Sequence, residues 1–163
     1  MQVRRQATLF LSEVTAIEEM RCRFNPAQAK LIGAHVTLCR EDEVFNWQAL
    51  HDRLFLCEPI HVTLEFGPPV KDGNLVILPT IGRTDDFDEL RYRLLSSNGT
   101  PPRKHNPHVT IIHPRNGICS DSIFQEIAAK IPGLSVTFTC VSLIEQHNGG
   151  TWRPVSQFGD QPA

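Results

Sequence analysis

Apolar and polar positions along this chain follow two alternating patterns, one typical of β-strands and one typical of α-helices. Segments in which apolar and polar residues alternate predict half-buried strands, and segments in which apolar residues return every three or four positions predict helices. A turn-rich segment at 67–73 separates two halves, each with the order strand, helix, strand, helix, strand. The expected strands cover residues 7–11, 34–40, 60–66, 74–79, 107–113, about 134–144 and 151–158, and the expected helices start near residues 15, 46, 86 and 121.

Three short signals set the ends of the expected helices. Thr15-Ala16-Ile17-Glu18 matches a capping box, in which the threonine caps the first helix and the glutamate bonds back to it. Asn25-Pro26 predicts the end of that helix, because proline disrupts a helix interior. Asn98-Gly99 predicts the end of the helix that starts near residue 86, since glycine readily follows a last helical turn.

The duplicated order predicts two packed lobes related by an approximate two-fold axis, because such a unit cannot bury its own apolar face. We expect a single α/β (α+β) domain over residues 1–158, with a tail at 159–163. Its lobes would cover roughly 7–66 and 74–158, and the pattern leaves open whether they are interleaved.

The tripeptide His-Val-Thr occurs three times, and each copy is followed by Leu or Ile. Because side chains alternate faces along a strand, the His and Thr of each copy share one face and the apolar residues point to the other. An imidazole beside a hydroxyl provides a proton donor or acceptor next to a neutral hydrogen-bond donor. The copies are His35-Val36-Thr37-Leu38, His61-Val62-Thr63-Leu64 and His108-Val109-Thr110-Ile111.

Two of the three copies occupy equivalent places in the two halves. His35 and His108 each lie in the middle strand of their half, so the two-fold arrangement predicts that their His-Thr faces converge on a cleft between the lobes. His61 lies in the last strand of the first half, where the second half offers no matching histidine. Glu65 shares its strand face and would repel a phosphate, so we interpret His61 as a residue of a solvated or structural face.

A pair of histidines suits the cleavage of a phosphodiester. A histidine titrates near pH ~6.5, so at neutral pH one ring of a pair can be neutral and the other protonated. The neutral ring takes a proton from water, and the protonated ring gives one to the leaving sugar oxygen. Thr37 and Thr110 would donate hydrogen bonds to the non-bridging phosphate oxygens. This chemistry needs no metal, and the sequence offers no carboxylate cluster for magnesium.

A metal site is the first alternative interpretation. His105, His108 and His113 fall close together and suggest zinc ligands. Strand alternation separates His108 from His113, however, and no Cys or carboxylate stands near them in the sequence. We therefore expect no bound metal.

The charge distribution bears on the class of ligand. A formal net charge of -2 argues against a general binder of long nucleic acids, which must neutralise many phosphates. Residues 90–120 nevertheless contain no Asp or Glu, while several Arg and His residues fall there. Two readings stay open, a site for a small phosphorylated ligand and a solvated basic face.

The cysteines and the hydropathy pattern bear on the compartment. The 5 cysteines are never spaced as Cys-x-x-Cys and predict neither a disulfide framework nor a zinc ribbon, so a reducing cytosol is expected. No apolar run approaches the ~18 residues of a membrane span. We expect a cytoplasmic monomer without membrane association.

The paired His-x-Thr-apolar strands, in a duplicated chain of this size, resemble the two-histidine (2H) phosphoesterase superfamily. That group includes bacterial 2′-5′ RNA ligase-like proteins and 2′,3′-cyclic nucleotide phosphodiesterases. The resemblance covers nearly the whole chain and implies a bilobal fold of two antiparallel sheets with outer helices around a central cleft, without a cofactor. It also implies that His35, Thr37, His108 and Thr110 carry the active-site roles, with His108 as the base and His35 as the acid.

The chain departs from this family pattern in two places. Members commonly have proline directly before each motif; Pro107 fits, but Gly33-Ala34 precedes the first motif. Many also place an arginine shortly after the second motif to hold the phosphate. Arg115 is our candidate for that clamp, and Arg103, from the loop before the motif, is a second candidate.

The sequence thus predicts a metal-independent phosphodiesterase that converts the 2′,3′-cyclic phosphate of RNA 3′ ends or small cyclic nucleotides into a 2′-phosphate. Two alternatives remain, 2′-5′ RNA ligation and a non-catalytic module that binds an RNA end or a nucleotide. Trp152, Tyr92 or a phenylalanine would stack on a base, and the sequence does not rank them.

Overall fold

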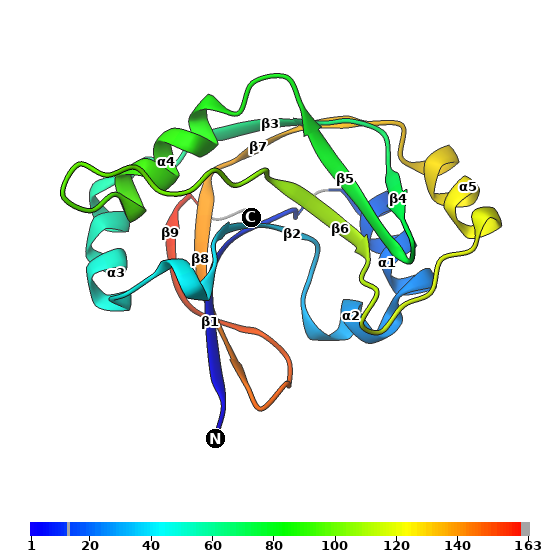
Figure 1. Cartoon of the computed structure of the whole chain (residues 1–163), viewed down its shortest axis with the longest axis horizontal. Coiled ribbons are helices and arrows are strands. Elements are labelled where there is room, and N and C mark those ends of the chain that lie inside the picture. The colour runs from blue at the N-terminus through cyan, green and yellow to red at the C-terminus, as the bar shows by residue number, and fades with distance from the viewer. Residues whose placement is uncertain (13, 161–163) are drawn as a thin grey trace.

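The fold is built around a strongly curled antiparallel sheet with helices packed outside it (Figure 1). A computed structural model describes residues 1–12 and 14–160, so residues 161–163 of the predicted tail lie outside the described residues. The strands are β1 (Val3–Phe10), β2 (His35–Cys39), β3 (Val62–Phe66), β4 (Val70–Asp72), β5 (Leu75–Ile81), β6 (His108–Ile112), β7 (Leu134–Phe138), β8 (Cys140–His147) and β9 (Arg153–Gly159). The helices are α1 (Thr15–Phe24), α2 (Pro26–Leu31), α3 (Trp47–Leu56), α4 (Asp85–Leu95) and α5 (Asp121–Lys130), with a 3₁₀ turn, η1 (Glu41–Glu43).

The strands follow one path in the order β7-β3-β5-β6-β2-β1-β8-β9, with β4 paired to β5. Every described pairing is antiparallel, which confirms the predicted mixed α/β class with antiparallel strands. The two halves of the chain are interleaved along this path, because β3 lies beside β5 and β7 while β8 lies beside β1. The motif strands β2 and β6 meet in the middle of the path.

The helices cover the sheet in a crossed arrangement. Helix α1 contacts β6 and helix α4 contacts β2, so each half places its first helix against the motif strand of the other half. Figure 1 shows α3 and α4 at one end of the molecule and α1, α2 and α5 at the other. Their apolar faces bury Ile17 and Met20 of α1 and Phe87 and Leu94 of α4 in the core.

Alternation along the motif strands determines which side chains enter the core. Val36 and Leu38 of β2 are fully buried, and Val109 and Ile111 of β6 are at most 1 % exposed. The histidine and threonine between them stay partly exposed on the opposite face. The predicted division of each motif into a core face and an open face is therefore present in the fold.

The predicted capping box at the start of α1 is wrong. Thr15 is the first helical residue, and the N-cap position is Val14, whose side chain makes no capping bond. The Glu18 carboxylate instead accepts from the Arg21 guanidinium and from the Ala34 backbone amide. These long-range partners draw Glu18 away from the helix end, which a local pattern does not reveal.

Three short elements, α2, β4 and the 3₁₀ turn η1, were not predicted. Asn25-Pro26 ends α1 as expected, but Pro26 also starts α2, because proline fits the first turn of a helix. The Asp72-Gly73 turn is present, and Gly73 has a φ of 58°. This turn joins β4 to β5 in a hairpin, within the segment that the sequence predicts to consist of turns. Among the described residues, no helix is long and apolar enough to span a membrane.

Candidate active site

The two predicted motifs lie side by side at the centre of the sheet. Val36 of β2 pairs with Val109 of β6 in antiparallel register. This register places His35 across from Thr110 and Thr37 across from His108, because partners in an antiparallel pair run in opposite directions. Directly opposed side chains have Cβ atoms about 4.5–5.5 Å apart, so the four polar groups surround one position above the sheet.

These four side chains line a cleft of about 480 Å³. Arg115, the first predicted phosphate clamp, also lines it, whereas Arg103 is absent from its lining. The remaining lining residues are largely polar and come from β1, α1, α2, η1 and the loops around β6 and β9; they are Arg4, Arg5, Gln6, Arg21, Gln28, Ile32, Arg40, Glu41, Asp42, His105, His113 and Trp152.

Both motif histidines are oriented by the same backbone contact. Nδ1 of His35 lies 2.8 Å from the carbonyl oxygen of Gly33, and Nδ1 of His108 lies 3.0 Å from that of Asn106. A carbonyl only accepts, so each Nδ1 carries the proton. The Nε2 atom of each ring is then left for a ligand, as an acceptor when the ring is neutral and as a donor when it is protonated.

The protein packed around the first histidine favours its neutral form. Burial lowers the pKa of His35 to about 4, and the nearby positive charges of Arg21 and His108 act in the same direction, while the Gly33 carbonyl opposes them. Burial also lowers the pKa of His105 and of His113, with Arg91 contributing at the first and Arg115 at the second. At neutral pH these three rings are uncharged in the free protein.

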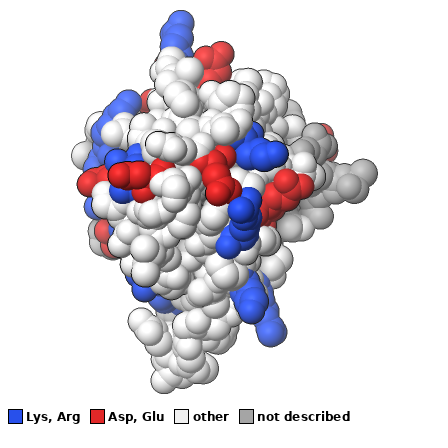
Figure 2. All heavy atoms as spheres, turned by 90° about the vertical axis from the view of Figure 1, so that its right-hand side faces the viewer, with Lys and Arg blue, Asp and Glu red and all other residues white. Residues whose placement is uncertain are grey.

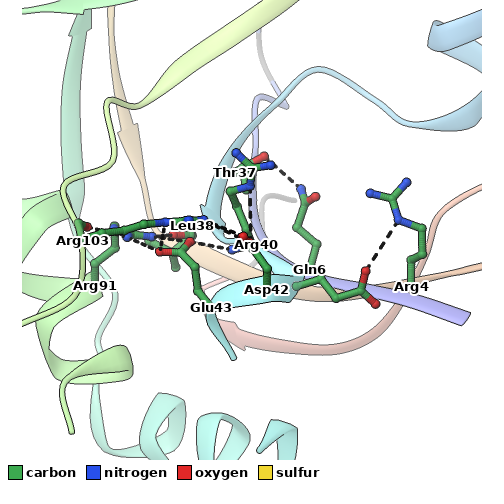
Figure 3. Close-up of polar contacts among 10 residues, drawn as sticks. Arg4, Gln6, Thr37, Leu38, Arg40, Asp42, Glu43, Arg91 and Arg103 are labelled. Atoms are coloured by element: carbon green, nitrogen blue, oxygen red, sulfur yellow. Dashed lines mark hydrogen bonds and ion pairs between the residues drawn. The ribbon is translucent and has the colours of Figure 1, made fainter. Parts of the chain in front are cut away.

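The first threonine is held by a neighbour on β1. Gln6 Nε2 donates to Thr37 Oγ1 at 3.1 Å (Figure 3) and also to Thr8 Oγ1 at 2.8 Å. Because Thr37 accepts from Gln6, its own hydroxyl proton stays available to a ligand. The second motif has no equivalent support from β5, since Thr110 pairs there with the apolar Ile77.

The two predicted arginines have different surroundings. Arg115 lies against His113, with Nη2 2.9 Å from Nε2 of that ring. Arg103 instead donates from Nη2 to both Asp42 carboxylate oxygens at 3.0 and 3.1 Å, and its Nε lies 3.4 Å from Glu43 (Figure 3). The structure brings Arg115 to the cleft and leaves Arg103 in an ion-pair network beside it.

The third His-Val-Thr copy does not line this cleft, as the repeat predicted. His61 directly precedes β3 and lines a separate small hollow with Asp86 and Glu89 of α4. Thr63 from the same copy lies 2.9 Å from Thr137 of β7, oxygen to oxygen, across the strand pair. Neither residue lines the cleft that holds His35 and His108.

Metal and thiol chemistry find little support in the side chains around the cleft. Within residues 1–12 and 14–160, no three His, Cys, Asp or Glu side chains are grouped to hold a metal ion. Cys39 follows the first motif in β2, but it is fully buried and burial raises the pKa of its thiol to about 12. A thiol with so high a pKa is not a nucleophile at neutral pH.

The charges outside the cleft are mixed in sign. Figure 2 shows the face over α5 and β4, where Lys and Arg side chains lie among Asp and Glu. Arg23 pairs with Glu126 at 3.0 Å and Lys71 with Asp121 at 3.7 Å. Such a face does not favour the binding of a long polyanion.

Sequence reasoning missed most of the walls of the cleft. Arg4, Gln6 and Thr8 follow one another on one face of β1, and that alternation was a usable signal. Trp152 comes from the loop before β9, and the guanidinium carbon of Arg4 lies 5.4 Å from the centre of its ring. No sequence signal placed Trp152 beside β1.

Comparison with known proteins supports the fold. No protein-family model and no curated protein sequence matches the chain. Three crystal structures of LigT from E. coli are similar to it, with NADP+, ATP and 3′-AMP bound, at TM-scores of 0.57, 0.61 and 0.56. Sequence identity is 18%, 18% and 17%, and the matches cover 96% of this chain and 96%, 96% and 97% of LigT. This chain therefore has the LigT fold.

Proposed function

We propose that this protein is a metal-independent phosphodiesterase that hydrolyses the 2′,3′-cyclic phosphate of RNA ends or nucleotides to a 2′-phosphate. The observation that carries the proposal is the arrangement of two His-Thr pairs across the Val36–Val109 contact, with each histidine oriented through Nδ1. Two histidines that flank one position provide a base and an acid for in-line displacement at phosphorus.

In the proposed reaction, a neutral histidine takes a proton from water and the water oxygen bonds to phosphorus. The bond between phosphorus and the 3′ oxygen then breaks, and the second histidine gives its proton to that oxygen. The products are a 2′-phosphate and a free 3′ hydroxyl, so atoms and protons balance. Each histidine is expected to contribute a factor of ~10²–10⁴ to the rate.

The surroundings of the two motif histidines favour one assignment of the base and the acid. The lowered pKa of His35 favours its neutral form, which supports His35 as the base and His108 as the acid. This order is the reverse of the one that the family resemblance implies. The acidic limb of the rate–pH profile tests it, because that limb follows the base of the free enzyme.

The proposed phosphate site combines two hydroxyls and one cation. Thr37 and Thr110 would donate to the non-bridging oxygens, and Arg115 would add a charge-assisted bond at the edge of the cleft. Arg103 is left out of this proposal because Asp42 and Glu43 already occupy its guanidinium.

A nucleotide is the ligand that the rest of the cleft suits best. Trp152 and Arg4 line the cleft together, and an indole ring is a sequence-independent platform for a base. The LigT structures hold NADP+, ATP and 3′-AMP, which are all nucleotides. These two observations support a nucleotide or RNA end over other cyclic phosphates.

The test is a hydrolysis assay that follows products by phosphorus NMR in excess EDTA, with 2′,3′-cyclic nucleotides and a short RNA ending in a 2′,3′-cyclic phosphate. We expect a 2′-phosphate product that is lost in His35→Ala and in His108→Ala. His61→Ala is the matched control and should retain activity, because that histidine does not line the cleft.

Other results of the same assay point to other functions. Turnover that EDTA abolishes would indicate a metal enzyme. Joining of a 5′-hydroxyl RNA through a new 2′-5′ linkage would indicate a ligase. Binding of every substrate without turnover would indicate a non-catalytic module that recognises RNA ends or nucleotides.

A further inference from the structure

Each half of the chain buries one arginine at the same place in its first helix. Arg21 is the seventh residue of α1, counted from Thr15, and Arg91 is the seventh of α4, counted from Asp85. Both residues are only 2 % exposed. A guanidinium stays charged in a protein, so burying one is costly unless its donors are satisfied.

Arg21 and its partner hold the chain on both sides of Gly33. Arg21 Nη2 donates to the Ile32 carbonyl at 2.7 Å, and its Nη1 donates to Glu18. The same Glu18 carboxylate accepts from the Ala34 amide at 2.9 Å. Gly33, between these two anchored peptides, supplies the carbonyl that orients His35 through its Nδ1 atom.

Arg91 of the second half also bonds to backbone carbonyls and to one carboxylate, with Leu38 and Glu43 in the first half and Arg103 in its own half (Figure 3). Its Nη2 donates to the Arg103 carbonyl at 3.0 Å and to Glu43 at 2.6 Å, and its Nη1 donates to the Leu38 carbonyl at 2.6 Å. Arg103 lies within the irregular stretch 101–107 that also carries Asn106, whose carbonyl orients His108.

The other end of that stretch is held as well. Thr80 Oγ1 donates to the Pro107 carbonyl at 3.1 Å. Residues 103–107 belong to no helix or strand, so these side-chain bonds replace the ladder that would otherwise fix the backbone. Asn106 therefore lies between two anchored carbonyls, those of Arg103 and Pro107, whereas Gly33 lies between the anchored Ile32 carbonyl and the anchored Ala34 amide.

We infer that Arg21 and Arg91 are positioning residues, each fixing the backbone carbonyl on which the motif histidine of its own half rests. Replacing a buried ion pair by well-packed apolar residues often leaves stability unchanged, so general stabilisation does not explain two buried arginines in equivalent places. Directional bonds to backbone carbonyls do explain them, because they hold each imidazole in one tautomer and one orientation. The part of this inference that concerns catalysis rests on the proposed function, whereas the hold on each ring does not.

The experiment records long-range proton–nitrogen NMR spectra of the histidine rings, which report the nitrogen that carries the proton. We compare the unmodified protein with Arg21→Met and Arg91→Met at pH 7.5, and assign the two rings from His35→Gln and His108→Gln spectra. Arg21→Met should shift the His35 ring away from the Nδ1–H tautomer and leave His108 unchanged. Arg91→Met should do the reverse.

Arg93→Met is the matched control. Arg93 is also on α4 and donates to a backbone carbonyl, that of Leu56 at 3.0 Å, but it is absent from the cleft lining. Its replacement should leave both rings unchanged. If Arg91→Met fails to fold because Glu43 is left without a partner, Arg91→Lys keeps the charge and still loses the fork that reaches both carbonyls.

Kinetics add a second readout. Each Met variant should lower kcat roughly tenfold and change KM by less than about twofold, the pattern of an outer partner that orients a functional histidine. The inference is overturned if either variant leaves its own histidine unchanged, or if each variant disturbs both rings alike. A selective NMR result in a protein without phosphodiesterase activity would refute the proposed function and leave the positioning role intact.

Discussion

Val36 of β2 pairs with Val109 of β6, and this contact forms the candidate site. Both valines are fully buried, so the register between the motif strands is set by the core. A slip of one residue would turn His35 and Thr37 into the core and the valines into the cleft, because strand side chains alternate with a period of two. Core packing therefore places each histidine across from the threonine of the other motif.

The lowered pKa of His35 predicts that the protein loses stability in mild acid. The unfolded chain protonates this ring near pH ~6.5, whereas the folded protein resists protonation until about pH 4. The unfolded state then binds more protons between these values, so the free energy of unfolding falls as the pH falls through that window.

Urea denaturation at several pH values between 7 and 4 measures this effect. His35→Gln should show a shallower fall than the unmodified protein, with the remainder due to groups such as His105 and His113, whose pKa values are also lowered. Equal slopes in the two proteins would contradict the prediction.

Gln6 is predicted to keep the Thr37 hydroxyl proton directed toward the ligand. A carboxylate of the same shape only accepts, so in Gln6→Glu the threonine would donate to residue 6 and no longer to the phosphate. We expect kcat to fall roughly 10- to 100-fold, toward the loss seen when one preorganised donor is removed.

A double-mutant cycle separates this effect from the added charge. In a Thr37→Val background the hydroxyl is absent, so Gln6→Glu should have little further effect on kcat. A full additional loss in that background would show that charge repulsion, and not hydroxyl orientation, is responsible.

Trp152 is predicted to bind the base of the substrate. Stacking contributes about 1–3 kcal/mol per base, so Trp152→Ala should raise KM for a 2′,3′-cyclic nucleotide about tenfold while kcat stays close to normal. Trp152→Phe should recover most of the affinity.

Tyr92→Ala is the comparison for that series, because Tyr92 is a 43% exposed aromatic on α4 that does not line the cleft. It should leave KM unchanged. If Trp152→Ala has the same KM as the unmodified enzyme, the base of the substrate does not bind on this side of the cleft.

Arg115 is predicted to contribute to substrate binding, and Arg103 is predicted to contribute only to the stability of the fold. Arg115→Ala should raise KM roughly 10-fold or more, since a hydrogen bond to a charged group contributes about 1.5–3 kcal/mol. Arg103→Ala should leave KM unchanged and lower the free energy of unfolding only slightly, because solvent-exposed ion pairs contribute little to stability.

Steady-state kinetics on both variants measure the change in KM, and urea denaturation measures the change in the free energy of unfolding. The reverse outcome, with KM raised only in Arg103→Ala, would mean that the substrate displaces the Asp42 and Glu43 contacts of that arginine.

The sequence by itself determined the order of the main helices and strands and the face on which each motif residue of β2 and β6 lies. Periods of two and near 3.6 depend only on backbone geometry, so β2, β6 and the main helices follow from short-range patterns. The repeat also separated His61 from His35 and His108, because it assigns equivalent places without any knowledge of the sheet order.

Only the tertiary structure decided which arginines and which neighbours reach the cleft. Arg103 and Arg115 look alike in the sequence, and they differ because Asp42 and Glu43 fold back beside one of them. Glu18 fits a capping box, yet the Ala34 amide lies within its reach in the fold. Gln6 and Trp152 enter the site because β1 lies between β2 and β8, and pairing between strands distant in the sequence leaves no trace in local periodicity.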